Sequence, residues 1–128
     1  MAFHLDHIHI TAKDPRRSAR WWADMFGATI LPEAEVRSIL FAPVSLDGVT
    51  INISGPRPSD TGMTADPPAI PYYGLEHLGI RVDELEATLA RFREQGLEIY
   101  ERRQNPTVRI AFVAAPDGVC LELMEPLQ

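Results

Sequence analysis

The sequence predicts an α+β fold made of two tandem βαβββ modules, and three features support that prediction. The segment Leu5–Ile10 returns later in the chain as Leu75–Ile80, with a histidine at the same place in each copy. Asp47–Ile53 returns at the same offset as Asp117–Leu123. Each of these copies begins with Asp-Gly, which favours a tight hairpin turn before a strand. A short duplicated unit seldom buries its apolar face alone, so the two modules are expected to pack together.

The first module begins with a strand. Residues 5–11 alternate as a half-buried strand does, with isoleucines on one face and histidines on the other. A helix should follow, because Asp14 offers a capping oxygen, Pro15 suits the first turn and Gly27 supplies a stop. Its buried stripe is expected at Ala19, Trp22, Ala23 and Phe26. Strands are then expected at about 28–32, 36–46 and 49–54.

The second module repeats this order. A strand is expected at 76–82, and Asp83 and Glu86 have the spacing of a capping box at the start of a helix. Gly96 ends that helix as Gly27 ends the first one. The buried stripe should consist of Leu85, Leu89 and Phe92. The remaining strands are expected near 97–101, 107–115 and 119–124.

A proline-rich stretch at about 56–73 separates the modules, which span about 3–55 and 74–126 within a single domain of residues 1–128. Such a stretch is a linker or a lid. Its apolar residues would be wasted on a pure linker, so a flap over a cavity is the preferred interpretation. Those residues are Met63, Ile70, Tyr72 and Tyr73.

Composition excludes several classes of function. The 128 residues are 45% hydrophobic, enough for a core, and the net charge of -6 argues against a nucleic-acid surface. The single cysteine, Cys120, cannot form an internal disulfide and is expected to be a buried, inert thiol. No basic-then-apolar leader and no run of roughly 20 apolar residues is present, which predicts a cytoplasmic protein without a membrane partner.

Four polar residues occupy equivalent positions in the two modules. His7 corresponds to His77, and Asn52 corresponds to Glu122. If the apolar residues that alternate with them face the core, the four converge on one concave face of a curved sheet. Two histidines and a carboxylate are the ligand set of a divalent metal site with open coordination positions.

With these motifs the chain resembles the vicinal oxygen chelate superfamily. That superfamily includes glyoxalase I, methylmalonyl-CoA epimerase, bleomycin resistance proteins, fosfomycin-resistance thiol transferases and extradiol dioxygenases. The resemblance extends from Leu5 to Glu125 and rests on Leu5–His7, Leu75–His77 and Pro116–Leu123 taken in order. It implies paired βαβββ modules that form a curved sheet around a metal cavity.

The resemblance also implies a ligand set. The positions that match the family's metal ligands are His7, His77 and Glu122. Glyoxalase I usually has Glu at the position of Asn52, and the epimerases have Gln. Asn is a shorter and weaker ligand, so whether Asn52 binds the metal or only orients a water or a substrate oxygen stays open. The implied cofactor is one divalent ion, which is Fe, Mn, Ni, Co or Zn.

Further residues are candidates for chemistry beside the metal. Besides Glu122, His9 is a candidate catalytic residue, because it shares a face with His7 and an imidazole titrates near neutral pH. A purely structural hydrogen bond is the competing interpretation for His9. Asn52, Arg109 and Tyr100 are candidates for substrate binding, and Arg109 could clamp an anionic group or simply be solvated.

The ligand set favours a metal-dependent lyase or isomerase of the glyoxalase or epimerase type. A bound ion polarises a carbonyl and acidifies the neighbouring C–H, so that proton transfer proceeds through an enediolate. The substrate would be a small oxygenated molecule that chelates the metal.

Two alternatives remain open. One is an Fe(II) extradiol dioxygenase, although many of these enzymes have four modules. The other is a metal-free small-molecule binding or resistance protein. Family members of this size commonly pair, so a homodimer is expected, and whether the site lies in one chain or across two stays open.

Overall fold

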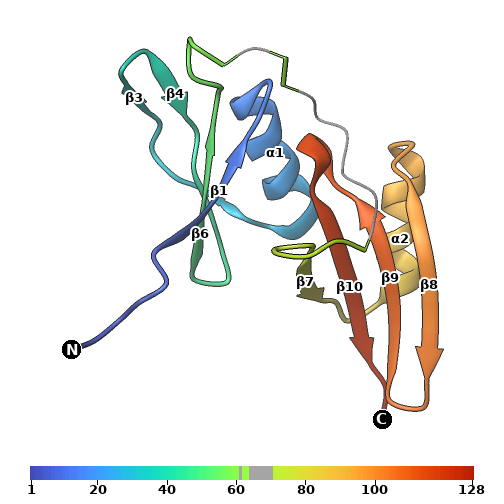
Figure 1. The fold of residues 1–128 in the computed structure, drawn as a ribbon. Helices are drawn as coiled ribbons and strands as arrows, with labels where there is room; N and C mark the ends of the chain where they lie inside the picture. The colour runs from blue at the N-terminus through green and yellow to red at the C-terminus, as the bar shows by residue number, and fades with distance from the viewer. Residues whose placement is uncertain (61, 64–70) are drawn as a thin grey trace. The chain divides into compact units, whose positions relative to one another are not determined.

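A computed structural model describes residues 1–60, 62–63 and 71–128 (Figure 1). The chain divides into two compact units, Met1–Ala65 (unit 1) and Asp66–Gln128 (unit 2). Each unit carries one β-sheet with an α-helix, so the α+β class and the paired modules predicted from the sequence are confirmed. No helix within the described ranges is long and apolar enough to cross a membrane.

Unit 1 has one helix and a six-stranded sheet with the order β2-β5-β6-β4-β3, to which β1 adds by pairing with β6. In chain order the elements are β1 (His7–Thr11), α1 (Pro15–Phe26), β2 (Thr29–Ile30), β3 (Ala34–Val36), β4 (Ile39–Phe41), β5 (Val44–Leu46) and β6 (Val49–Ser54). The predicted Asp-Gly turn joins β5 to β6, with positive φ at both Asp47 and Gly48, as a tight hairpin of this type requires.

Unit 2 has one α-helix and a four-stranded sheet with the order β7-β10-β9-β8. In chain order its elements are β7 (Leu78–Arg81), α2 (Leu85–Glu94), β8 (Ile99–Asn105), β9 (Val108–Ala114), a single 3-10 turn η1 (Pro116–Gly118) and β10 (Cys120–Pro126). The second Asp-Gly pair lies in this turn, and Asp117 and Gly118 both have positive φ.

The duplication read from the sequence is also a duplication of strand pairing. β1 lies parallel to β6 with His9 opposite Asn52. β7 lies parallel to β10 with Gly79 opposite Glu122, which is the same register. The first strand of each unit therefore pairs with the last strand of the same unit. His7, His9, Asn52 and Glu122 lie on these two pairs of strands, and His77 immediately precedes β7.

Helix α1 begins and ends at the predicted signals. The Asp14 carboxylate accepts a hydrogen bond from the backbone N–H of Arg17 at 3.2 Å, and Pro15 occupies the first turn. Gly27 ends the helix in the left-handed conformation with φ 69°. Trp22, from the predicted stripe, is buried at 1% exposure, and α1 contacts β5 and β6 through this face.

The predicted continuous strand at 36–46 is wrong. Arg37 and Ser38 have positive φ and form a hairpin turn between β3 and β4, so the chain reverses where the prediction extends it. β4 and β5 then run antiparallel to β6, but they are interrupted at Ala42 and Pro43. Proline has no N–H to donate to a ladder, which explains the interruption.

The predicted capping box of α2 is also wrong. The N-cap is Glu84 instead of Asp83, and it makes no side-chain capping hydrogen bond. The Oε1 atom of Glu125 in β10 accepts the hydrogen bond from the Leu85 N–H at 2.7 Å. A residue distant in sequence therefore caps this helix, and a local sequence rule cannot detect such a cap. The buried stripe is confirmed, since Leu85, Leu89 and Phe92 are each 0% exposed.

We expect Glu125→Ala to lower the free energy of unfolding by about 1–2 kcal/mol, the usual loss for a helix cap. The substitution leaves the Leu85 N–H without its acceptor and also removes the ion pair between Glu125 and Arg109 at 3.2 Å. Urea denaturation checks this value. The control is Glu101→Ala, because Glu101 forms only an exposed ion pair with Arg103 and should cost well under about 1 kcal/mol. Equal losses in both variants would contradict the capping role.

The predicted linker or flap at about 56–73 lies partly outside the described residues, which exclude 61 and 64–70. Ile70, one of its apolar residues, falls outside them. Met63 lines a cavity of unit 1, whereas Tyr73 is fully exposed and Tyr72 donates a hydrogen bond from its hydroxyl to the Leu75 carbonyl at 2.9 Å.

Candidate functional site

Each of the two repeated histidines is held by the acidic residue that precedes it. In unit 1 the His7 Nδ1 atom lies 2.6 Å from a carboxylate oxygen of Asp6. In unit 2 the His77 Nδ1 atom lies 3.0 Å from a carboxylate oxygen of Glu76. A carboxylate on one ring nitrogen fixes the orientation and tautomer of the ring and leaves Nε2 as the nitrogen that can bind a metal. The two histidines therefore present the same nitrogen, each within its own unit.

Glu122 lies on the sheet face of unit 2 that is turned away from the helix. Leu121, Leu123 and Glu125 alternate with it along β10 and form the helix-facing side, where the two leucines are 0% exposed. Opposite Glu122 stands Gly79, and a Cβ atom there would lie 3.6 Å from the Glu122 carboxylate. The glycine leaves that side of the carboxylate open.

His77 and Glu122 meet at Phe112. Phe112 pairs directly with Glu122 across β9 and β10. The His77 ring lies edge-on to the Phe112 ring with 5.1 Å between centroids. Burial is the main cause that raises the pKa of the Cys120 thiol, and the negative charges of Glu76 and then Glu122 act in the same direction. Unit 2 thus gathers two of the three predicted ligands around one aromatic ring, and the predicted buried thiol, 4% exposed, lies in reach of the carboxylates.

In unit 1 the residue opposite Asn52 on the neighbouring strand is a histidine, whereas in unit 2 the residue opposite Glu122 is a glycine. His9 stands opposite Asn52 in the parallel pairing of β1 with β6. The His9 Nε2 atom lies 2.8 Å from the Ser54 hydroxyl oxygen, and that hydroxyl donates to the Gly55 carbonyl at 3.2 Å. Because the hydroxyl has one hydrogen, His9 donates from Nε2 to Ser54, and the Nδ1 atom of a neutral His9 is left as an acceptor.

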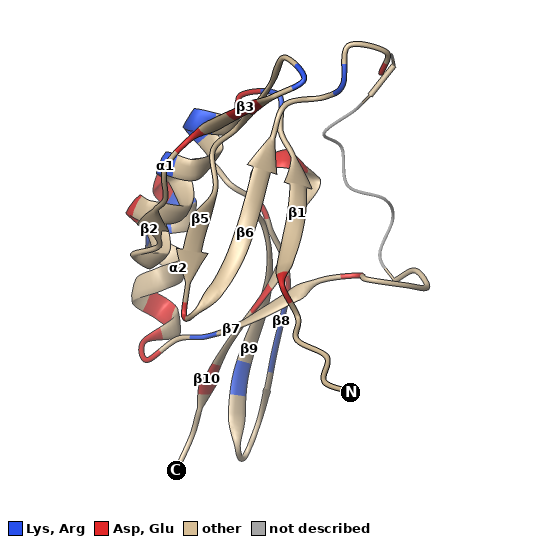
Figure 2. Cartoon of the chain, turned by 90° about the vertical axis from the view of Figure 1, so that its left-hand side faces the viewer, with Lys and Arg blue, Asp and Glu red and all other residues tan. Residues whose placement is uncertain are grey.

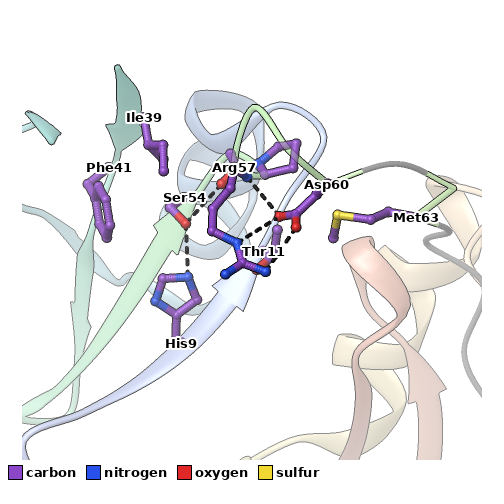
Figure 3. A pocket seen from close by; sticks show the side chains of 10 residues that line it. His9, Thr11, Ile39, Phe41, Ser54, Arg57, Asp60 and Met63 are labelled. Carbon is purple, nitrogen blue, oxygen red and sulfur yellow. Dashed lines mark hydrogen bonds and ion pairs between the residues drawn. The ribbon is translucent and has the colours of Figure 1, made fainter. Parts of the chain in front are cut away.

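His9 also borders a cavity of about 540 Å³ in unit 1 (Figure 3). This volume lies within the roughly 300–1,000 Å³ range of small-molecule sites. The serine and the arginine that line it, Ser54 and Arg57, were not among the residues predicted from the sequence. Their position beside His9 could not be predicted from the sequence, because β1 and the end of β6 are far apart in the chain and meet only in the folded sheet.

Arg109 lies on the other face of the unit 2 sheet from Glu122. Its guanidinium pairs with Glu125, the residue that caps α2. In Figure 2 a basic position of β9 lies beside an acidic position of β10, and the basic positions of β8 lie on the far side of β9. This placement favours a structural role for Arg109 over contact with a ligand held at Glu122.

Arg103, unlike Arg109, lies on the same face of the unit 2 sheet as Glu122. Its guanidinium carbon lies 5.2 Å from the centroid of the Phe112 ring. The hydrogen bond with Glu101 is the main cause that raises the pKa of Arg103, and the charge of Glu122 adds to it. A bulge between Ile99 and Glu101 shifts the alternation of β8, so sequence periodicity assigns Arg103 to the wrong face.

Tyr100 is the residue at that bulge and is half-buried. Burial raises the pKa of its phenol, and the charges of Glu98 and then Cys120 act in the same direction.

No single unit assembles the complete ligand set. Among the described residues there is no group of three or more His, Cys, Asp or Glu side chains placed to hold a metal ion. His7 belongs to unit 1, whereas His77 and Glu122 belong to unit 2. The donors nevertheless fit a divalent ion in kind, because two imidazoles with oriented Nε2 atoms and a carboxylate beside an open glycine suit such a cation.

The fold and these motifs define a class of protein made of paired βαβββ units. The chain belongs to the Glyoxalase/Bleomycin resistance protein/Dioxygenase superfamily, whose family model matches residues 4–123. The family resemblance inferred from the repeated histidine motifs is therefore confirmed.

Individual relatives were found by sequence and by structure. The chain is 29% identical over 123 residues to the uncharacterized protein YaeR of Escherichia coli, covering 93% of each chain. A glyoxalase family protein from Bacillus cereus has a TM-score of 0.85 at 14% identity, covering 100% of this chain and 97% of that one. A variant of the fosfomycin resistance protein FosX from Listeria monocytogenes, complexed with Mn(II) and 1S,2S-dihydroxypropylphosphonic acid, has a TM-score of 0.72 at 18% identity and covers 96% of this chain and 92% of that one. At these identities the solved structures show the shared fold.

Proposed function

We propose that this protein is a divalent-metal-dependent enzyme, a lyase or isomerase of the glyoxalase or epimerase type. His7, His77 and Glu122 supply the ligands of one Fe, Mn, Ni, Co or Zn ion. The observation that carries this proposal is the repeated pairing of a carboxylate with a histidine, Asp6 with His7 and Glu76 with His77, which leaves the same nitrogen of each ring available. The Mn(II) bound by the FosX variant supports a metal in this family.

The open carboxylate adds to this argument. Glu122 accepts no hydrogen bond from any described residue, and Gly79 leaves space beside it. The charge of Arg103 acts on this half-buried carboxylate without a hydrogen bond between them, and a bound cation would give the carboxylate a direct partner. A divalent ion held there would polarise a chelated carbonyl oxygen and acidify the neighbouring C–H.

The chain's own residues then handle the proton and the substrate. The Nε2 atom of His9 is engaged by Ser54, and no described residue occupies its Nδ1 atom, which can accept a hydrogen bond or a proton. Asn52 stands opposite His9 and orients a substrate oxygen through its amide. Tyr100 contributes a phenol that its environment keeps protonated. Arg103, on the face of Glu122, takes the anion-binding role that the sequence suggested for Arg109.

Metal analysis of the purified protein tests this proposal. Protein prepared without chelator is expected to hold about one equivalent of one of these ions, to lose it on dialysis against a chelator and to regain it on reconstitution. Substrate turnover should follow the metal content across a panel of α-hydroxy and α-keto compounds. A protein that purifies without metal and takes none up on reconstitution would contradict the proposal.

A metal-free binding protein is the second candidate, and the cavity of unit 1 favours it. In that cavity Ser54 holds the Nε2 atom of His9 and Asp60 pairs with Arg57, while the Nδ1 atom of His9 is left as an acceptor, so a ligand can bind there without a metal. A binder of this kind should purify without metal, and His77→Ala should leave its ligand affinity unchanged.

We also propose that the protein works in the cytoplasm, as its composition suggests, and that it forms a homodimer, an expectation that comes from the family resemblance. Light scattering after size-exclusion chromatography measures the mass of the assembly. A mass equal to that of one chain at micromolar concentration would contradict the dimer.

A further inference from the structure

The cavity of unit 1 combines a balanced ion pair, a hydrogen-bond acceptor and an apolar wall. Figure 3 shows His9 near the centre, with Phe41 on one side and Arg57, Asp60 and Met63 on the other. All of these residues belong to unit 1. The described residues that line the cavity therefore all come from one unit, and the chemistry of the cavity is argued from these residues.

The charges that line the cavity cancel. The Arg57 guanidinium contacts the Asp60 carboxylate through Nη2 to Oδ1 at 2.9 Å and through Nε to Oδ2 at 3.3 Å. The Arg57 N–H also donates to Asp60 Oδ2 at 2.9 Å. These hydrogen bonds lower the pKa of Asp60 and raise that of Arg57, so both remain ionised. Because Asp60 already balances the Arg57 charge, an anionic ligand gains less here than it would beside an unpaired cation, and an uncharged ligand loses nothing.

The acceptor in the cavity is the Nδ1 atom of His9. The bonds from His9 Nε2 to Ser54 and from Ser54 to Gly55 fix the direction of the network. Ser54 is only 4% exposed, so this network is anchored in the core of the unit. A ligand that carries a hydroxyl group can donate its hydrogen to Nδ1.

The apolar wall favours a flat ring. Phe41 lies edge-on to His9 with 5.9 Å between ring centroids, and Ile39 adjoins it on β4. Met63 lines the cavity as well, and its thioether makes favourable contacts with aromatic rings. Aromatic and sulfur-containing walls gain most from an aromatic ligand.

We propose that this cavity binds an uncharged aromatic alcohol of the phenol class, with its hydroxyl group donating to His9 Nδ1 and its ring against Phe41 and Met63. His9 and His7 lie on the same face of β1, two residues apart, so the bound hydroxyl lies toward the proposed metal ligand. As a statement about the substrate of the enzyme, the inference rests on the proposed function. Binding itself requires no metal.

The experiment uses the full chain after treatment with a chelator, and it follows backbone amide shifts by NMR during titration with phenol, anisole and benzoate. Phenol is expected to shift the amides around His9, Phe41 and Ser54 and to bind more tightly than either of the others. Anisole has the same ring but no hydroxyl hydrogen, and its affinity should be about 3- to 10-fold lower, the usual effect of one neutral hydrogen bond. Benzoate should bind more weakly than phenol because the Arg57 charge is already balanced.

Two variants separate the hydrogen bond from the ring contact. His9→Phe should lower the affinity for phenol by about 3- to 10-fold and leave the affinity for anisole unchanged. Phe41→Ala should lower the affinity for both probes. The matched control is Val36→Ala, on the exposed strand β3, which does not line the cavity and should change neither affinity. His9→Leu repeats the first test if the larger ring disturbs the fold.

Three results would overturn the inference: no saturable shifts with phenol, tighter binding of benzoate than of phenol, or equal loss of phenol and anisole in His9→Phe. Because the metal is absent throughout, these results do not bear on the metal proposal. Failure of the protein to bind metal would in turn leave phenol binding intact.

Discussion

Glu122→Gln is expected to lower the affinity for the divalent metal by at least about 100-fold, more than the roughly 10- to 100-fold loss that follows removal of a ligand's supporting partner. The substitution keeps the size of the side chain but replaces an anionic ligand with a neutral amide. Glu122 is half-buried beside Gly79 on the face of Phe112, so solvent cannot fully replace its charge. Competition with a chromophoric chelator measures the affinity of both proteins.

The matched control is Glu125→Gln. Glu125 is on the same strand, but its carboxylate points to the other face, where it caps α2 and pairs with Arg109. Its substitution should lower stability and leave the metal affinity unchanged. A loss of affinity in both variants would point to a general loss of structure, and retention of affinity in Glu122→Gln would remove this residue from the ligand set.

Trp22→Ala is expected to lower the free energy of unfolding by about 3–5 kcal/mol, the usual cost of truncating a large buried aromatic residue. Trp22 is 1% exposed and has rings on two sides, with Trp21 at 5.3 Å and Phe26 at 5.8 Å between centroids. A domain of this size has a total stability of only about 5–15 kcal/mol, so the variant should be close to unfolding. Thermal and urea denaturation followed by circular dichroism measure the change.

Trp21→Ala is the matched control on the same helix. Trp21 is half-buried, and its removal leaves the position of Trp22 under the sheet intact. Its cost should be about 1 kcal/mol, typical of an average substitution. If the two variants lose the same stability, the core of unit 1 does not centre on Trp22.

The elements that local chemistry specifies were predictable from the sequence. Asp14, Pro15 and Gly27 bound α1 as expected, because capping and left-handed backbone depend only on neighbouring residues. The turn at Asp47 and Gly48 was predictable for the same reason. The duplication was visible because both copies retain a histidine at the same place in the first segment and Asp-Gly-Val at the start of the second, at one common offset.

Other features depended on partners far away in the sequence. The turn at Arg37 and Ser38 places two non-glycine residues at positive φ, which residue preferences oppose and strand pairing imposes. The bulge at Tyr100 changed the face of Arg103, and no residue near it signals a bulge. These are the places where tertiary contacts outweighed local propensity.

Residue order alone was enough to identify a doubled βαβββ protein of this superfamily, with His7 matching His77 and Asn52 matching Glu122, because repeats and periodicity are properties of residue order. Folding was needed to establish which charged side chains share a face with Glu122 and which support the helix behind it. Neighbours across a sheet are set by strand register and bulges, and register depends on packing between distant segments. Arg103 and Arg109 lie on different faces of the sheet for that reason, although the sequence alone does not distinguish them.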